Sequence, residues 1–321
     1  MVFDPKINRW VAKPGTTSRT RGEGWASSTI GEHGIRGLRG GILPQGPKVV
    51  FWGDSFVEAL QVEDSERMAQ VFTALARQDG LVMSGVGIGN GGDTLIDAVL
   101  RLPDYAVSLA PVTLNVLVLS RLEDLLPDKL RPCRSRFVST PGFRLERMDC
   151  PPSLIARRLA SPFRTLELAG AFEVFRKLKA ITLRLDPGPA ACAPEEERLA
   201  PKADEDAAFN FLLNYIREQS HSPVLLLRIP PIPTLEQGRI RLADPQPKFS
   251  QKIAQACERN GVGFLDLAPA FAAHFQTTGR FAHGFFNSPP GTGHLNQDGH
   301  QIVAEAVLNY IKKNRNALLA P

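Results

Sequence analysis

The stretch Lys48-Val49-Val50-Phe51-Trp52-Gly53-Asp54-Ser55-Phe56 reads as a buried strand that runs into a Gly-Asp-Ser turn and then a helix. Open parallel sheets place their chemistry at the carboxyl ends of the strands. We therefore expect the Ser55 hydroxyl at that edge. By itself, a serine in such a turn is better explained as the cap of the following helix.

A second informative block, Gly293–His300, lies near the other end of the chain. It places His294 just before an amphipathic helix that the spacing predicts over Gln301–Lys312. A histidine delivered there could meet the Ser55 hydroxyl across the rim of the sheet and act as its base. The two blocks together indicate a Ser-His hydrolase or acyltransferase. His300 is better explained by packing or capping within the last helix.

Between these blocks, short apolar runs alternate with helical patterns. Such alternation predicts a three-layer α/β/α fold around a parallel, roughly five-stranded flavodoxin-like sheet with right-handed crossovers. The predicted strands are Val49–Trp52, Leu81–Ser84, Leu114–Leu119, Val224–Ile229 and Val262–Leu265. The predicted helices between them are Ser65–Gln78, Thr94–Arg101, Glu205–Gln219 and Pro247–Asn260.

Two segments depart from the alternation. Residues 1–45 are rich in Gly, Arg, Ser and Thr without apolar periodicity, and predict an extended N-terminal arm over a main domain of residues 46–321. Residues 127–202 form an inserted cap or subdomain with helical patterns at 153–159 and 165–185 and a Pro-rich exit at 186–201. It is either an anion-recognising cap, for example for an acidic glycan, or a helical subdomain with a solvated basic face. Among its arginines are Arg131, Arg134, Arg136, Arg144, Arg147, Arg157, Arg158 and Arg164.

The Gly-Asp-Ser-Phe and Gly-His-Leu-Asn blocks, in this order and at this distance, resemble the SGNH (GDSL-type) esterase and acyltransferase superfamily, and its bacterial GDSF-like subgroup in particular. The resemblance implies that Ser55 is the nucleophile and His294 the base. The block Val86–Thr94 is similar to the family's glycine block, with Gly87 where asparagine is common. On that likeness, the backbone N–H groups of Ser55 and Gly89 would form an oxyanion hole.

Further roles follow from the same resemblance. Asp54 would anchor the Gly-Asp-Ser turn, and Asn90 and Asp93 would orient the glycine loop or simply form its turn.

Two departures from the family pattern concern the site itself. Glu123 stands where the family has an oxyanion-hole asparagine, in Arg121-Leu122-Glu123-Asp124 after the strand ending at Leu119. An ionised carboxylate would oppose the developing oxyanion. The acid usually found three residues before the histidine is replaced by Gly291. Losing one oxyanion donor typically costs on the order of 100- to 1000-fold in turnover, so the site is either rebuilt or weakened.

The sequence leaves the rebuilding open. A backbone carbonyl or a carboxylate from another loop could orient His294. Asp266, at the end of a late strand, is one candidate, although it is better explained as the cap of the next helix, and Asp298 is another with the same alternative. Glu123 could also be a buried, protonated acid that donates to the oxyanion.

The composition limits other functions. The net charge of +5 is diffuse, so it permits an anionic partner such as a polysaccharide or membrane but does not favour nucleic acid. The chain carries no Gly-rich phosphate loop and no metal-ligand spacing among its six histidines, and we expect neither cofactor nor metal.

The sequence also bears on location. No signal peptide and no stretch long enough to span a membrane occurs in it. Residues 3–10 and 31–37 are similar to the lead-in of bacterial members with an upstream membrane anchor, which favours a periplasmic or other extracytoplasmic location and possible proximity to a membrane. Cys133, Cys150 and Cys192 are either free or, for the first two, bridged, and Cys257 reads as a buried thiol.

We therefore expect a serine esterase or O-acyltransferase/deacylase that acts through a Ser-His acyl-enzyme. Its substrate would be an ester, such as a short acyl group on a glycan. The alternative is a catalytically degenerate SGNH fold that binds carbohydrate or acts as a scaffold; Glu123 and Gly291 support it.

Overall fold

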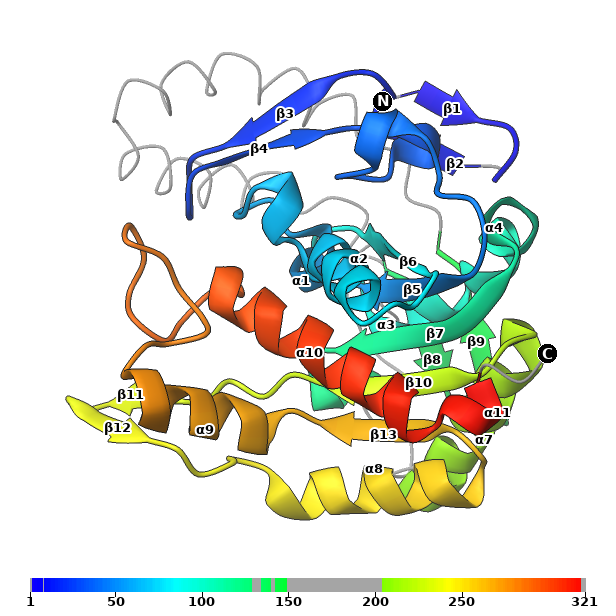
Figure 1. Ribbon diagram of the computed structural model, residues 1–321. Helices are drawn as coiled ribbons and strands as arrows, with labels where there is room; N and C mark the ends of the chain where they lie inside the picture. Colours follow the sequence, from blue (N-terminus) through cyan, green and yellow to red (C-terminus); the bar gives the residue numbers. More distant parts are fainter. Residues whose placement is uncertain (1, 8, 129–133, 140–141, 149–203, 319–321) are drawn as a thin grey trace, which may run out of the picture. The chain divides into compact units, whose positions relative to one another are not determined.

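A computed structural model describes residues 2–7, 9–128, 134–139, 142–148 and 204–318 (Figure 1). The chain divides into two compact units, one formed by residues 1–126 and 204–321 and the other by residues 127–203. The helices predicted at 153–159 and 165–185, and the exit segment at 186–201, lie outside the described residues.

The first unit contains a five-stranded parallel sheet, which confirms the predicted fold class. The strands lie in the order β13-β10-β7-β5-β6. Since the chain passes from β5 to β6 on one side and then to β7 on the other, the strand order reverses between β5 and β7. Sheets of this kind bind ligands at the carboxyl ends of the strands beside that reversal. The bounds are β5 (Lys48–Gly53), β6 (Ser84–Gly89), β7 (Val112–Leu119), β10 (Val224–Arg228) and β13 (Gly263–Asp266).

Helices cover both faces of this sheet. On one face α2 and α10 lie side by side (Figure 1), and Val49 and Phe51 of β5 pack into the apolar cluster that these two helices share with α1 and α9. On the other face, α3 contacts β5 and β7, α7 contacts β10, and α8 contacts β13. Trp52 of β5 packs edge-on against Tyr105 of α4 and donates its indole N–H to Asn115. The helices are α1 (Ser55–Glu58), α2 (Met68–Gln78), α3 (Leu95–Val99), α4 (Leu102–Leu109), α7 (Glu205–Ser220), α8 (Pro247–Arg259), α9 (Ala268–Thr278), α10 (Gln297–Lys313) and α11 (Arg315–Leu318).

The N-terminal segment forms two antiparallel hairpins. These are β1 (Val2–Asp4) with β2 (Arg9–Val11), and β3 (Thr17–Thr20) with β4 (Ala26–Thr29). Strand β4 is tied to the start of α2, because Arg67 donates to the Ser28 hydroxyl and the Thr29 N–H donates to Asp64. The segment is thus fixed on the first unit by specific hydrogen bonds.

Short elements complete the described chain. They are the 3-10 turns η1 (Glu32–Gly34), η2 (Arg39–Gly41), η3 (Asp64–Glu66) and η4 (Leu122–Leu125), and the hairpin of β11 (Thr234–Glu236) with β12 (Arg239–Arg241). The described part of the second unit contains the antiparallel pair β8 (Arg136–Val138) and β9 (Arg144–Glu146).

The second strand was placed wrongly from the sequence. The prediction was Leu81–Ser84, whereas β6 spans Ser84–Gly89 and includes half of the glycine block. Its alternating glycines face the helices: a Cβ on Gly85 would lie 2.2 Å from the Ala69 carbonyl oxygen of α2. A Cβ on Gly89 would lie 2.2 Å from the Glu58 nitrogen of α1. The glycines therefore serve close packing, although glycine weakens the strand signal in the sequence.

This packing predicts that Gly89→Ala destabilises the protein strongly and Gly87→Ala does not. The Gly89 methyl would meet backbone of α1 that cannot rotate away, and overpacking of this kind costs about 1–3 kcal/mol or more. At Gly87 the nearest atom to a new Cβ is a Val57 methyl at 3.5 Å, an ordinary contact. Urea unfolding of both variants measures the difference. Equal midpoints would contradict the close approach of β6 to α1.

Candidate functional site

Ser55 is the first residue of α1 and directly follows the turn at the end of β5. Asp54 holds this turn, since its carboxylate accepts hydrogen bonds from the Phe56 N–H at 2.9 Å and from the Ser120 hydroxyl at 2.7 Å. Ser120 follows β7, so the turn is fixed to the neighbouring strand across the strand-order reversal. Ser55 itself is partly exposed at the carboxyl edge of the sheet.

The loop after β6 reaches the same place. A Cβ built on Gly91 would lie 4.0 Å from the Ser55 Cβ, so Gly91 is a loop neighbour of Ser55. The Gly91 N–H donates to Glu58 at 2.7 Å. Gly89, by contrast, is the last residue of β6 and packs against the first turn of α1.

Polar side chains hold the rest of this loop. Asn90 donates to Asp93 at 2.8 Å, and the buried Asp93 is also paired with Arg101. Arg121, two residues after β7, donates to the Asp93 carbonyl oxygen at 2.8 Å and lies 3.8 Å from the Asp54 carboxylate. The two loops are therefore linked through polar groups of Asp54, Asn90 and Asp93.

His294 is brought to the same helix from the far end of the chain. Its ring packs edge-on against Phe56, the neighbour of Ser55, with centroids 5.8 Å apart. The segment before α10 is held in place because the Gly284 N–H donates to the His294 carbonyl oxygen at 2.9 Å and His283 bridges to Leu295. The structure thus places the His294 ring against Phe56, the residue that follows Ser55 in α1.

A residue that the sequence analysis missed completes this group. Glu23, in the turn between β3 and β4, lies 2.5 Å from His294 Nδ1 through Oε2 and accepts the His294 backbone N–H through Oε1 at 2.9 Å. An ionised carboxylate can only accept, so the Nδ1–H donates, and in the neutral imidazole Nε2 is then the nitrogen without a proton and can take one. The arrangement has the form of a base oriented by an acid.

The contacts of Glu23 affect its pKa. Partial burial raises the pKa of Glu23, but hydrogen bonds from the His294 ring and backbone outweigh burial and hold the pKa below its ordinary value. The neighbouring His283 is buried, and burial lowers its pKa to about 4. His283 is therefore neutral near pH 7. The ring that binds the Glu23 carboxylate is that of His294.

Asn287 fixes the Glu23 turn. Its side-chain oxygen accepts the Gly24 N–H at 2.8 Å, and its amide nitrogen donates back to the Gly24 carbonyl oxygen at 3.3 Å. Gly24 has φ +67°, and a Cβ there would lie 2.5 Å from the Gln61 carbonyl oxygen, so only glycine fits. In Figure 1 the β3–β4 turn and the loop before α10 accordingly lie next to each other.

The other acids considered from the sequence have different partners. Asp266 accepts hydrogen bonds from Arg228 at 2.9 Å and from the Ala268 N–H at 2.9 Å, so it pairs with β10 and caps α9. Asp298 accepts from Arg280 at 2.7 Å, and the cap of α10 is Asn296. Neither of these carboxylates is bonded to His294, and Glu23 takes the position proposed for them.

The glycine in the family's acid position also has a structural reason. Gly291 has φ +71°, and a Cβ there would lie 2.6 Å from the Phe281 ring. An aspartate would be strained and would collide at this position. A carboxylate that orients His294 could therefore come only from another part of the chain.

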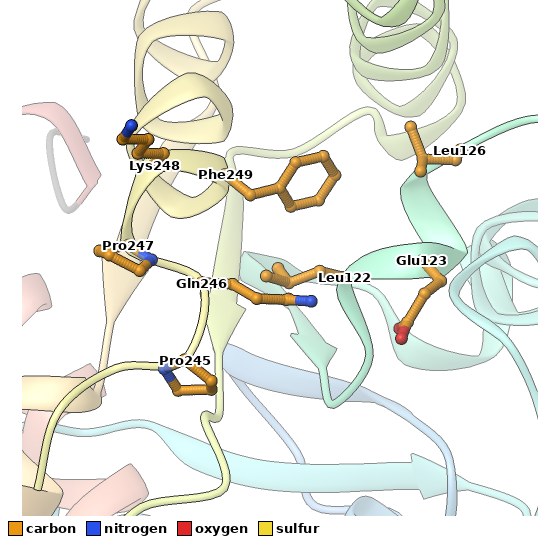
Figure 2. Close-up of a pocket in the computed structure, with 8 residues that line it drawn as sticks. All are labelled: Leu122, Glu123, Leu126, Pro245, Gln246, Pro247, Lys248 and Phe249. Atoms are coloured by element: carbon orange, nitrogen blue, oxygen red, sulfur yellow. The ribbon is translucent and has the colours of Figure 1, made fainter. Parts of the chain in front are cut away.

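The Glu123 side chain is not buried. It is exposed on η4 and lines a pocket of about 440 Å³ between η4 and the start of α8 (Figure 2). Figure 2 shows Leu122 and Glu123 facing Gln246 and Phe249 across this pocket. The hypothesis of a buried, protonated Glu123 is wrong, because the side chain is in contact with solvent.

The expectations about metals, membrane-spanning segments and cysteines can be compared with the structure only within the described residues. Within the described ranges, no group of three or more His, Cys, Asp and Glu side chains could hold a metal ion. No helix built from the described residues has both the length and the apolar character to cross a membrane. Cys257 is buried and free, and burial raises its pKa to about 12. Cys133, Cys150 and Cys192 lie outside the described residues.

No protein-family model and no curated protein matches the chain. Among solved structures, the chain is similar to the acetyl xylan esterase AlAXEase, with 15% identity over 82% of this chain and 99% of that one and a TM-score of 0.44.

Two other solved structures are similar to the chain at comparable identity, coverage and TM-score. A catalytic mutant of Axe2, an acetylxylan esterase from Geobacillus stearothermophilus, has 14% identity over 84% of this chain and 95% of that one, with a TM-score of 0.43. The esterase EstA from Pseudoalteromonas sp. has 12% identity over 84% of this chain and 98% of that one, with a TM-score of 0.41. The substrates in these names are those proteins' own.

Proposed function

We propose that the protein is an SGNH-type serine esterase or O-acyltransferase in which Ser55, His294 and Glu23 form the catalytic triad. The observation that carries the proposal is the His294 ring, which packs beside the start of α1 while Glu23 holds its Nδ1. A serine at the carboxyl edge of a parallel sheet, a histidine beside it and a carboxylate behind the histidine are the parts that acyl transfer requires.

In this mechanism, His294 Nε2 removes the Ser55 hydroxyl proton while Oγ attacks the ester carbonyl carbon. The protonated imidazole then gives its proton to the departing alcohol, and an acyl-enzyme remains on Ser55. Water as the acceptor gives hydrolysis, and a sugar hydroxyl gives transacylation. Glu23 keeps His294 in the tautomer that can accept the proton and stabilises the imidazolium once it forms.

The oxyanion would be held by backbone N–H groups. Ser55 is the first residue of α1, where the backbone N–H has no intrahelical acceptor, and the backbone N–H that the Asp54 side chain accepts is that of Phe56. The Ser55 N–H is the first donor of the proposal, and the Gly89 N–H, from the family resemblance, is the second. The exposed Glu123 has no part in this hole.

Reaction with a fluorophosphonate probe tests the proposal. An activated serine displaces fluoride from the probe, and intact-mass analysis followed by peptide mapping should find one adduct, on Ser55, together with turnover of p-nitrophenyl acetate. A folded protein that shows neither adduct nor turnover would favour the degenerate carbohydrate-binding function, for which the carboxylate of Glu123 at the family's asparagine position is the supporting observation.

A further inference from the structure

The turn between β3 and β4 carries exposed groups on either side of Glu23. Trp25 is 65% exposed, and the Arg21 guanidinium carbon lies 4.9 Å from the centroid of its ring. A cation over an indole face is attracted to its π electrons, so Arg21 supports the ring from one side. The turn therefore presents an aromatic surface and a positive charge together.

This surface lies close to the proposed triad. Consecutive Cα atoms are about 3.8 Å apart, so Trp25 and Arg21 each lie within roughly 8 Å of the Glu23 Cα. Glu23 itself is bound to the His294 ring and backbone. A group resting on the turn would therefore be bound beside the residues proposed to act on the ester.

The turn is also fixed rather than loose. Asn287 bonds both the N–H and the carbonyl oxygen of Gly24 and reaches the Arg21 carbonyl oxygen at 3.5 Å. Phe286, the residue before Asn287, is 80% exposed, so a second exposed ring stands next to the residue that fixes the turn. Large exposed aromatic side chains on a fixed support are typical of binding surfaces rather than of ordinary protein surface.

Charge indicates what kind of group would bind. Residues 1–45 contain seven basic and three acidic residues, so they carry four of the five net positive charges of the chain. Arg19, on β3 just before the turn, is exposed as well. The one carboxylate of the turn, Glu23, is taken up by His294. The nearby Glu63 carboxylate accepts hydrogen bonds from Ser27. The exposed basic side chains of Arg19 and Arg21 lie on the other side of Glu23 and complement an anion.

We propose that Arg21 and Trp25 form a subsite for an anionic sugar ring of an acylated polysaccharide. The apolar C–H face of a pyranose would stack on the indole, and its carboxylate would pair with Arg21. This inference rests on the proposed function and names the substrate class of that site. The ester to be cleaved would lie on the same or an adjacent ring.

Kinetics with three substrates test the subsite: acetylated oligogalacturonide, acetylated xylo-oligosaccharide and p-nitrophenyl acetate. We expect Trp25→Ala to raise KM for the acidic oligosaccharide about tenfold, the size of one stacking contact. The kcat of Trp25→Ala for the acidic oligosaccharide and its turnover of p-nitrophenyl acetate should stay unchanged. Trp25→Phe should recover most of the affinity, and Phe3→Ala, which removes another exposed aromatic residue of the arm, serves as the control.

Arg21→Gln separates stacking from charge. It should raise KM for the acidic oligosaccharide and leave KM for the neutral one unchanged. Equal effects on both would overturn the assignment of an anionic ring. An unchanged KM in Trp25→Ala, or an equal loss with p-nitrophenyl acetate, would overturn the subsite.

Calorimetric titration of Ser55→Ala with unacetylated oligogalacturonide keeps this proposal distinct from the proposed function. Binding that Trp25→Ala weakens supports the subsite even when the wild type turns over no ester. Absence of binding overturns the subsite even when p-nitrophenyl acetate is hydrolysed.

Discussion

Ser55→Ala is expected to lower kcat for p-nitrophenyl acetate by a factor on the order of 10⁵–10⁶. Without the hydroxyl no acyl-enzyme forms, and in serine hydrolases removal of the nucleophile abolishes the contribution of the whole triad. The remaining rate would come from binding and backbone N–H groups alone. Steady-state hydrolysis at enzyme concentrations high enough to detect a slow residual rate measures the loss.

The fold should be unaffected by this change. Alanine suits the first turn of α1, and the cap of that helix is the Asp54 side chain, which does not involve the Ser55 hydroxyl. Ser120→Ala is the matched variant, since Ser120 also lies at the sheet edge with its hydroxyl bound to Asp54. Ser120→Ala should keep the fluorophosphonate adduct that Ser55→Ala loses. An adduct that persists in Ser55→Ala would remove Ser55 as the nucleophile.

Most of the sheet could be predicted from the sequence because buried parallel strands are continuous apolar runs. The runs of β5, β7 and β10 lie within one or two residues of their predicted bounds. Strand β6 could not be recognised in this way. Its sequence is Ser-Gly-Val-Gly-Ile-Gly, in which every second side chain is missing so that α1 and α2 can approach. The need for close packing removed the pattern on which the prediction relies.

The two ends of the site, Ser55 and His294, were within reach of sequence reasoning because each is embedded in a recognisable turn next to a periodic element. Glu23 was not, because it lies in an arm without apolar periodicity and far from His294 in sequence. One weak signal was available. The arm contains only three acidic residues, and Glu23 stands between two glycines in Gly22-Glu23-Gly24. Only the fold shows that this turn faces the segment before α10.

The absence of an acidic residue at position 291 and the presence of Glu23 beside His294 have a common geometric explanation. A Cβ on Gly293, next to His294, would lie against the Glu23 carboxylate, so the residue before the histidine is free of a side chain where Glu23 arrives. Gly291 is equally confined by Phe281 and by its positive φ. The loop before α10 therefore leaves room at Gly293 for a carboxylate from another part of the chain, and Glu23 of the N-terminal arm occupies that room.

Glu23→Gln is the second large effect that we expect, a reduction of kcat by about a thousand- to ten-thousandfold with little change in KM. Both oxygens of Glu23 accept hydrogen bonds, one from the His294 backbone N–H and one from the ring. A glutamine has only one oxygen. Its NH₂ group cannot face the backbone N–H, since both are donors, so it must face Nδ1.

Nδ1 would then have to accept, and the ring proton would move to Nε2, the atom that should take the Ser55 proton. The variant would keep the shape of the site but hold His294 in the wrong tautomer. Glu32→Gln is the matched control, because Glu32 also accepts a backbone N–H in the same arm, from Leu43, but does not contact His294. It should retain wild-type kcat. If Glu23→Gln, with an unchanged unfolding midpoint, loses less than about tenfold, Glu23 only anchors the arm, and His294 works without an acid.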